Sequence, residues 1–206
     1  MGEACCGRHV DVRALQARQR RVLSIVLGIN AATFAMMVWA SWYSGSSSLL
    51  SGGLDNLGDA ATYAMSLAVV RASAFAKARV ALFKGLMILA AAGGVLVQIA
   101  WRLAHPAVPL FESMGLAALL NLGANITCMR LLMPFRAGDV NLASAWECAR
   151  NDVIEGCAVL AAAAGVGVLH AGWPDWLIAG ALLMVFVRSA GRVLAAAWRG
   201  MQASTT

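Results

Sequence analysis

The sequence predicts an all-α, multi-pass membrane protein, and three observations carry that prediction: an apolar composition, long uncharged segments and an uneven distribution of basic residues. The chain has 206 residues, of which 61% are hydrophobic and 13% are charged, whereas about 25% of the residues of a soluble domain are charged. Residues 22–54 contain no ionisable side chain except Tyr43. This segment exceeds the roughly 20 apolar residues that cross a bilayer, which argues against an ordinary soluble enzyme.

Six apolar segments of this kind follow one another, and each is predicted to form a spanning helix. Together they make a six-helix domain at residues 22–198, between an N-terminal tail at residues 1–21 and a short C-terminal tail at residues 199–206. The first segment is long enough to span a membrane and follows about twenty polar residues. A cleaved signal peptide instead has a short apolar stretch soon after a charged start. The segments are residues 22–43, 49–70, 80–101, 108–129, 140–169 and 174–198.

Basic residues predict the orientation, because Lys and Arg accumulate in cytoplasmic segments. With the N-terminus in the cytoplasm, the loops on the opposite side carry only Arg102. We therefore expect both termini in the cytoplasm. The membrane itself is expected to be a bacterial inner (plasma) membrane. The basic tail is expected to contact anionic lipid and not nucleic acid. The basic residues on the cytoplasmic side are Arg8, Arg13, Arg18, Arg20, Arg21, Arg71, Lys77, Arg79, Lys84, Arg130, Arg136, Arg192 and Arg199.

Acidic residues inside the predicted helices are the strongest functional signal. A carboxylate at the bilayer centre costs about 2.5 to 3.5 kcal/mol to insert and commonly serves function. Asp55 and Asp59 are four residues apart and share one face of the second helix, while Cys148, Asp152 and Glu155 share one face of the fifth. Because the two helices run in opposite directions and carry these residues near their midpoints, the two faces are predicted to meet at one depth.

The donor set on these two faces predicts a metal site. Neither face carries a lysine or arginine, so the charge that neutralises the acids is expected to come from outside the chain. Three carboxylates and a thiol suit a tetrahedral divalent transition metal such as Zn²⁺. The predicted ligands are Asp55, Asp59, Cys148 and Asp152.

Auxiliary metal-binding groups are also present. Glu155 lies on the face of Asp152, one turn further along, and is a candidate for an extra ligand, a proton acceptor or an exit-path group. Before the first helix, Cys5, Cys6 and His9 form a compact set that is a candidate for capturing metal.

Amides and small residues in the helices predict packing contacts. We expect Asn30, Asn121 and Asn125 to form hydrogen bonds between helices. The small residues 90–94 of the third helix allow close backbone approach, either within one subunit or across a homodimer.

At the acidic faces the sequence resembles the cation diffusion facilitator family of six-helix metal exporters. The resemblance rests on SLLSGGLDNLGD at residues 48–59, NLASAWECARND at residues 141–152 and WPDW at residues 173–176, and it extends over about residues 22–198. The well-known zinc exporters carry His or Asp where this chain has Cys148. The family's C-terminal cytoplasmic domain is expected to be absent, and the short loop at residues 135–140 contains no histidine.

The resemblance implies Zn²⁺ export from the cytoplasm by alternating access in exchange for protons, by a homodimer in the lipid bilayer. Proton coupling also has a reason in the residues, since carboxylates and thiols must lose protons to bind metal. The thiolate favours softer ions, so Cd²⁺ and Co²⁺ are further candidate substrates, and Mg²⁺ and Ca²⁺ are not. No prosthetic group and no enzymatic activity are expected.

Two other functions fit the same residues. A membrane metal sensor or scaffold would bind the ion without moving it. A proton-coupled exporter of organic cations would use the acids as counter-ions, and the Cys148 thiol would then matter little.

Overall fold

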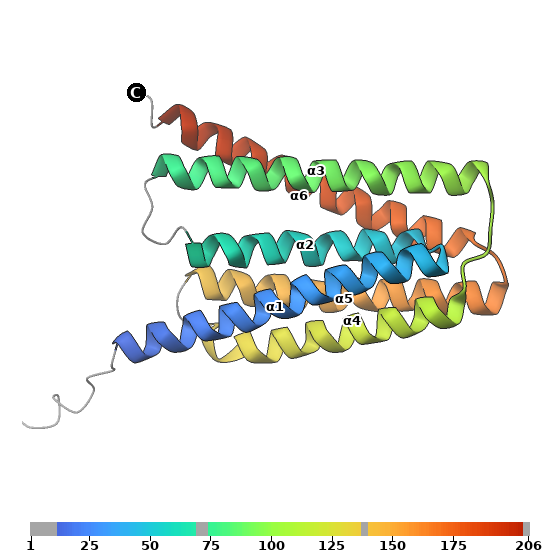
Figure 1. Cartoon of the computed structure of the whole chain (residues 1–206), viewed down its shortest axis with the longest axis horizontal. Helices are drawn as coiled ribbons and strands as arrows, with labels where there is room; N and C mark the ends of the chain where they lie inside the picture. Colours follow the sequence, from blue (N-terminus) through green and yellow to red (C-terminus); the bar gives the residue numbers. More distant parts are fainter. Residues whose placement is uncertain (1–11, 69–73, 137–139, 204–206) are drawn as a thin grey trace, which may run out of the picture.

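The computed structural model describes residues 12–68, 74–136 and 140–203, and over these residues the chain is all-helical, with no strand. The helices run antiparallel in succession, and α1 begins at the same end of the bundle at which α6 finishes (Figure 1). The described elements are α1 (Val12–Ser44), α2 (Ser47–Ala68), α3 (Ala74–Ala104), α4 (Phe111–Leu132), the 3-10 turn η1 (Met133–Phe135), α5 (Val140–Leu169) and α6 (Trp173–Ala203).

The helix boundaries extend beyond the predicted segments at both ends of the chain. Helix α1 begins at Val12, within the predicted tail, and α6 continues past Trp198 to Ala203. Polar and basic side chains occupy these extensions. The apolar stretches therefore mark only the parts of the helices that hydropathy can recognise.

Three of the helices are long and apolar enough to cross a membrane, which indicates an integral membrane protein. Two shorter apolar helical stretches, Ala92–Ala104 and Trp173–Val185, lie in α3 and α6. Helix α2 is long enough but less apolar, because serines, glycines and two aspartates interrupt it. The three spanning stretches are Ala17–Ser44, Phe111–Phe135 and Cys148–Leu169.

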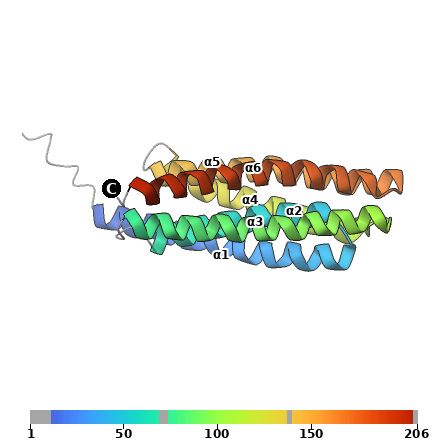
Figure 2. The same ribbon diagram turned by 90° about the horizontal axis from the view of Figure 1, so that it is seen from above.

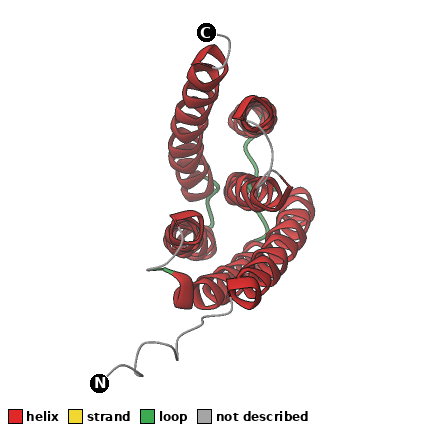
Figure 3. Cartoon of the chain, turned by 90° about the vertical axis from the view of Figure 1, so that its left-hand side faces the viewer, coloured by secondary structure: helices red, strands yellow, loops and turns green. Residues whose placement is uncertain are grey.

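Helices α1, α2, α5 and α4 pack in a ring, each against the next, and α3 lies outside this ring against α6 and α2. Figure 2 shows all the helices running along one common axis. Figure 3 views the bundle from the end where α1 begins and α6 finishes, which we call the terminal end. The opposite end, where tight turns join α1 to α2 and α5 to α6, we call the turn end.

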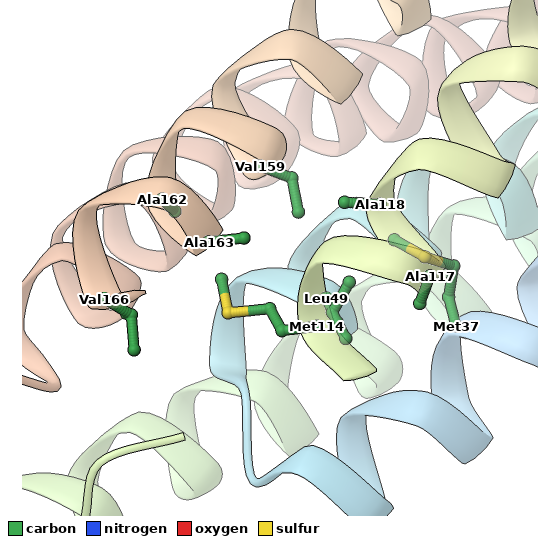
Figure 4. Packing of buried hydrophobic residues seen from close by; sticks show 9 residues of the cluster. All are labelled: Met37, Leu49, Met114, Ala117, Ala118, Val159, Ala162, Ala163 and Val166. Atoms are coloured by element: carbon green, nitrogen blue, oxygen red, sulfur yellow. The ribbon is translucent and has the colours of Figure 1, made fainter. Parts of the chain in front are cut away.

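Two apolar clusters fill the four-helix ring, one toward each end. The turn cluster is rich in alanine and methionine (Figure 4), and the terminal cluster contains two buried aromatic side chains. The buried members of the turn cluster are Met37, Leu49, Met114, Ala117, Ala118, Val159, Ala162, Ala163 and Val166. Those of the terminal cluster are Leu23, Val26, Tyr63, Cys128, Leu132, Phe135, Ala145 and Ala149.

The connection between α1 and α2 is a tight turn at Gly45 and Ser46. Gly45 has a φ of +75°, a conformation that glycine adopts without a steric penalty. A side chain at this position would also collide with the guanidinium group of Arg102 from α3. Gln98, also on α3, donates a hydrogen bond to the carbonyl oxygen of Ser46 (3.2 Å). Helix α3 therefore supports the turn from outside the four-helix ring.

Asp175 of α6 caps the first turn of α2 from across the bundle. Its Oδ1 accepts hydrogen bonds from the Ser46 hydroxyl (2.6 Å) and the Ser48 N–H (3.0 Å), and its Oδ2 accepts one from the Ser47 N–H (2.7 Å). Ser46 Oγ in turn accepts from the Leu49 N–H (3.1 Å). The first N–H groups of a helix have no partner within it, and a carboxylate there also complements the helix dipole.

Replacing Asp175 with alanine should destabilise the protein strongly. The substitution leaves one hydroxyl and two backbone N–H groups buried without their acceptor, at about 1 to 3 kcal/mol for each. We expect a loss of about 3 kcal/mol or more, and a smaller loss for Asp175→Asn, which keeps one acceptor oxygen. Thermal unfolding in detergent, followed by tryptophan fluorescence, measures the effect.

Glu112 provides the matched control, because it is an acid in the first turn of α4 and its side chain is exposed. Glu112→Ala should cost less than about 1 kcal/mol, since only a dipole interaction is lost. Equal losses for Glu112→Ala and Asp175→Ala would contradict the capping role.

Candidate functional site

A layer of polar side chains lies between the two apolar clusters, and every helix of the four-helix ring contributes to it. Its members on each helix come between the residues of the terminal cluster and those of the turn cluster. We call it the polar layer, and its principal members are Asn30, Asp55, Asn56, Asp59, Asn121, Asn125, Asp152 and Glu155. The acids of α2 and α5 thus come together at mid-depth, as their helical faces predict.

Asp55 and Asp152 join α2 to α5 directly, through a hydrogen bond between their side chains. One of the two must carry a proton, because a carboxylate only accepts hydrogen bonds. Asp152 is 4% exposed and also lies within electrostatic reach of Asp59 and Cys148. The four predicted metal ligands therefore form one interacting group across the two helices.

Asp59 is held by a neighbour that the sequence reasoning missed. It is 7% exposed, and its Oδ2 accepts a hydrogen bond from the Tyr63 hydroxyl at 2.6 Å. The same hydroxyl lies 3.5 Å from the carbonyl oxygen of Ala145 on α5. The available signal was the spacing, since a tyrosine four residues after an acid lies on the same helical face.

Glu155 lies on α5 toward the turn end, where it is half-buried. The charges of Asp55 and Asp59 both act on it. Glu155 therefore belongs to the acidic group, at its turn side.

Asparagines tie the remaining helices to the polar layer, as predicted. Asn56 Nδ2 donates to Asn121 Oδ1 (2.7 Å) and links α2 to α4. Asn125 Nδ2 donates to the backbone oxygen of Asp152 (3.4 Å) and links α4 to α5. Asn30 Nδ2 contacts the Cys128 sulfur at 3.8 Å and links α1 to α4.

Residues 22–70, which include α2 and most of α1, contain no lysine, arginine or histidine. This part of the chain therefore brings no basic side chain to the acids. Helix α5 carries Arg150, whose side chain is exposed and whose guanidinium carbon lies 5.5 Å from the centre of the Trp146 ring. Arg136 approaches the same ring from the chain segment after η1, at 6.0 Å. These arginines lie against an aromatic face toward the terminal end of α5.

Within the described residues, no group of three or more His, Cys, Asp or Glu side chains is arranged to hold a metal ion. Asp55 and Asp152 interact with each other, and Asp59 is hydrogen-bonded to Tyr63. Cys148 is half-buried. The candidate capture residues Cys5, Cys6 and His9 lie outside the described residues.

No model of a protein family matches the chain, and no curated protein matches its sequence.

Asp55→Asn should stabilise the protein in the absence of metal. The amide can donate to Asp152 without a shared proton, and one acid is removed from an apolar environment. We expect a gain of about 1 to 2 kcal/mol in the free energy of unfolding, measured by thermal unfolding in detergent with a chelator present.

The neighbouring Asn56→Ala serves as the comparison. It removes the bond to Asn121 and should destabilise by about 1 kcal/mol. A destabilised Asp55→Asn variant would mean that the acid is kept for structural reasons.

Proposed function

We propose that this protein exports a divalent transition metal, most suitably Zn²⁺, from the cytoplasm in exchange for protons. The proposal rests mainly on one observation: acids from α2 and α5 converge in a buried layer. Helices α1 and α2 bring no basic side chain to this layer. A divalent cation is the partner that resolves this imbalance of charge.

The donor atoms narrow the choice of cation. Oxygen donors from Asp55, Asp59 and Asp152 combined with the Cys148 sulfur suit Zn²⁺, Cd²⁺ or Co²⁺, whereas Mg²⁺ and Ca²⁺ prefer oxygen alone. The bonds among these side chains must open for an ion to bind. Glu155, on the turn side of the group, is a candidate group for the exit path.

Exchange with protons follows from the same bonds. Asp55 and Asp152 interact with each other, and a proton between them would be displaced by a cation that binds both carboxylates. Metal and proton therefore compete for the same oxygens, which is the minimum that an antiporter needs. Binding from the cytoplasm releases a proton there, and release of the metal on the other side allows a proton to return.

Alternating access is consistent with the two apolar clusters on either side of the polar layer. Each cluster separates the acids from one end of the bundle, so an ion can leave only when one cluster opens. We propose that the terminal end is cytoplasmic and that all six helices cross the membrane. The common end of α1 and α6 in Figure 1 supports an even number of crossings.

Membership of the cation diffusion facilitator family is part of this proposal. Two of the three motifs that carry the resemblance contribute the interacting acids of α2 and α5. A homodimer is proposed through α3, where Gly93 and Gly94 have open space beside them.

Metal uptake into proteoliposomes tests the proposal. Wild-type protein should move Zn²⁺, and more weakly Co²⁺, when a pH gradient is imposed, while Asp59→Asn should reduce the rate at least 100-fold because a ligand charge is lost. Fluorescent metal indicators and a pH dye inside the vesicles report the two fluxes. Asn121→Asp, an acid added elsewhere in the polar layer, is the control for general charge effects and should not restore transport to Asp59→Asn.

The other candidate functions predict different results. Metal binding without flux would indicate a sensor or scaffold. Flux of tetraalkylammonium or other organic cations without metal flux would indicate an organic-cation exporter. Either result would contradict metal export.

Cys148→Ser tests the donor set. Replacing the thiol with a hydroxyl should lower Cd²⁺ uptake by about 10-fold or more and affect Zn²⁺ less, because a soft ligand favours the softer ion. Cys157→Ser is the matched control, since that cysteine is exposed on the other side of α5. Unchanged Cd²⁺ uptake in Cys148→Ser would remove Cys148 from the proposed site.

A further inference from the structure

Tyr63 lies at the boundary between the polar layer and the terminal cluster. Its side chain is 1% exposed, and its ring packs in the terminal cluster. Its hydroxyl points to the acids, where it meets Asp59 Oδ2 at 2.6 Å. A buried phenol normally has a partner for its hydroxyl, and here that partner is a proposed metal ligand.

The hydroxyl of Tyr63 also relates α2 to α5. Its second contact is the carbonyl oxygen of Ala145, at 3.5 Å, two turns from Asp152 on the same helix. A phenol has one hydrogen to donate, so the short contact to the carboxylate is the stronger bond. The ring of Tyr63 shares the terminal cluster with Ala145 and Ala149 of α5, and this packing keeps the hydroxyl, and with it Asp59, beside α5.

We propose that Tyr63 is a positioning residue of the cation site, where its hydroxyl holds Asp59 Oδ2 so that the carboxylate meets a metal ion at a fixed distance from the donors on α5. This inference rests on the proposed function. The proposed ligands come from two helices, so the site has its geometry only while the helices keep their separation. Hydrogen bonds that orient carboxylate ligands generally contribute 10-fold to 100-fold to metal affinity.

The substitution that isolates the hydroxyl is Tyr63→Phe, because the ring continues to fill the terminal cluster. In the proteoliposome assay, KM for Zn²⁺ should rise about 10-fold or more, while the maximal rate changes far less. Tyr43→Phe is the matched control, since Tyr43 is the other tyrosine of the chain and is 68% exposed. That control should keep the wild-type KM.

Infrared spectroscopy provides a second measurement that leaves Tyr63 intact. In Tyr43→Phe, every tyrosine signal comes from Tyr63. Adding Zn²⁺ to this variant should shift the phenol C–O band, because the metal draws electron density from the carboxylate that accepts the hydrogen bond. The band should be missing from the variant that also carries Tyr63→Phe.

The results separate this inference from the proposed function. Zn²⁺ uptake by wild type with an unchanged KM in Tyr63→Phe, or with no shift of the phenol band in Tyr43→Phe, would overturn the role of Tyr63 and leave metal export standing. An absence of uptake by wild type would overturn both. A raised KM together with the band shift would support both.

Discussion

The pairing of Asp55 with Asp152 is the constraint that the packing of the central helices has to accommodate. Two carboxyl groups meet between apolar clusters, where unshared charge is costly. A shared proton reduces that cost but does not remove it, so the surrounding structure must hold the groups together. Two asparagine hydrogen bonds to α4 contribute to this. Asn56, next to Asp55 on α2, donates to the Asn121 side chain, and Asn125 of α4 donates to the backbone oxygen of Asp152. The polar layer thus stabilises an arrangement that its acids alone would disfavour.

Helix α2 is fixed at three depths, which explains how a helix interrupted by glycines and acids keeps its place. At the turn end Asp175 caps its first turn, and Ser51 Oγ donates to the Ala179 carbonyl oxygen at 3.1 Å, so that both bonds join it to α6. In the middle, Asn56 joins it to α4, and beyond the acids the ring of Tyr63 packs in the terminal cluster with residues of α5. These contacts join α2 to three different helices, α6, α4 and α5. A movement that opens one end of the bundle must therefore shift α2 relative to α5 or α4 while its capped end stays with α6.

The sequence alone predicted the all-helical fold and the meeting of the two acidic faces, because both follow from local periodicity and from the antiparallel succession of helices. It also predicted interhelical bonds of Asn30, Asn121 and Asn125, since a buried amide needs a partner. It did not reveal Tyr63 or the capping role of Asp175. Asp175 bonds to residues more than 120 positions away, and that pairing depends on how α6 packs on α2. Hydropathy likewise failed to predict the ends of α1 and α6. A helix can continue through polar residues as long as its backbone hydrogen bonds are formed, and hydropathy detects only the apolar part.

The two apolar clusters differ in a way that bears on the order of opening. The turn cluster consists largely of alanines and of the methionines Met37 and Met114, which are small or adaptable and can repack at little cost. The terminal cluster contains the rings of Tyr63 and Phe135, and Tyr63 is hydrogen-bonded to Asp59. The Tyr63 ring therefore connects the packing of the terminal cluster to the position of Asp59, whereas the buried members of the turn cluster are alanine, valine, leucine and methionine side chains. Occupancy of the acidic group is thus coupled more directly to the terminal side, the side from which the proposed cargo would enter.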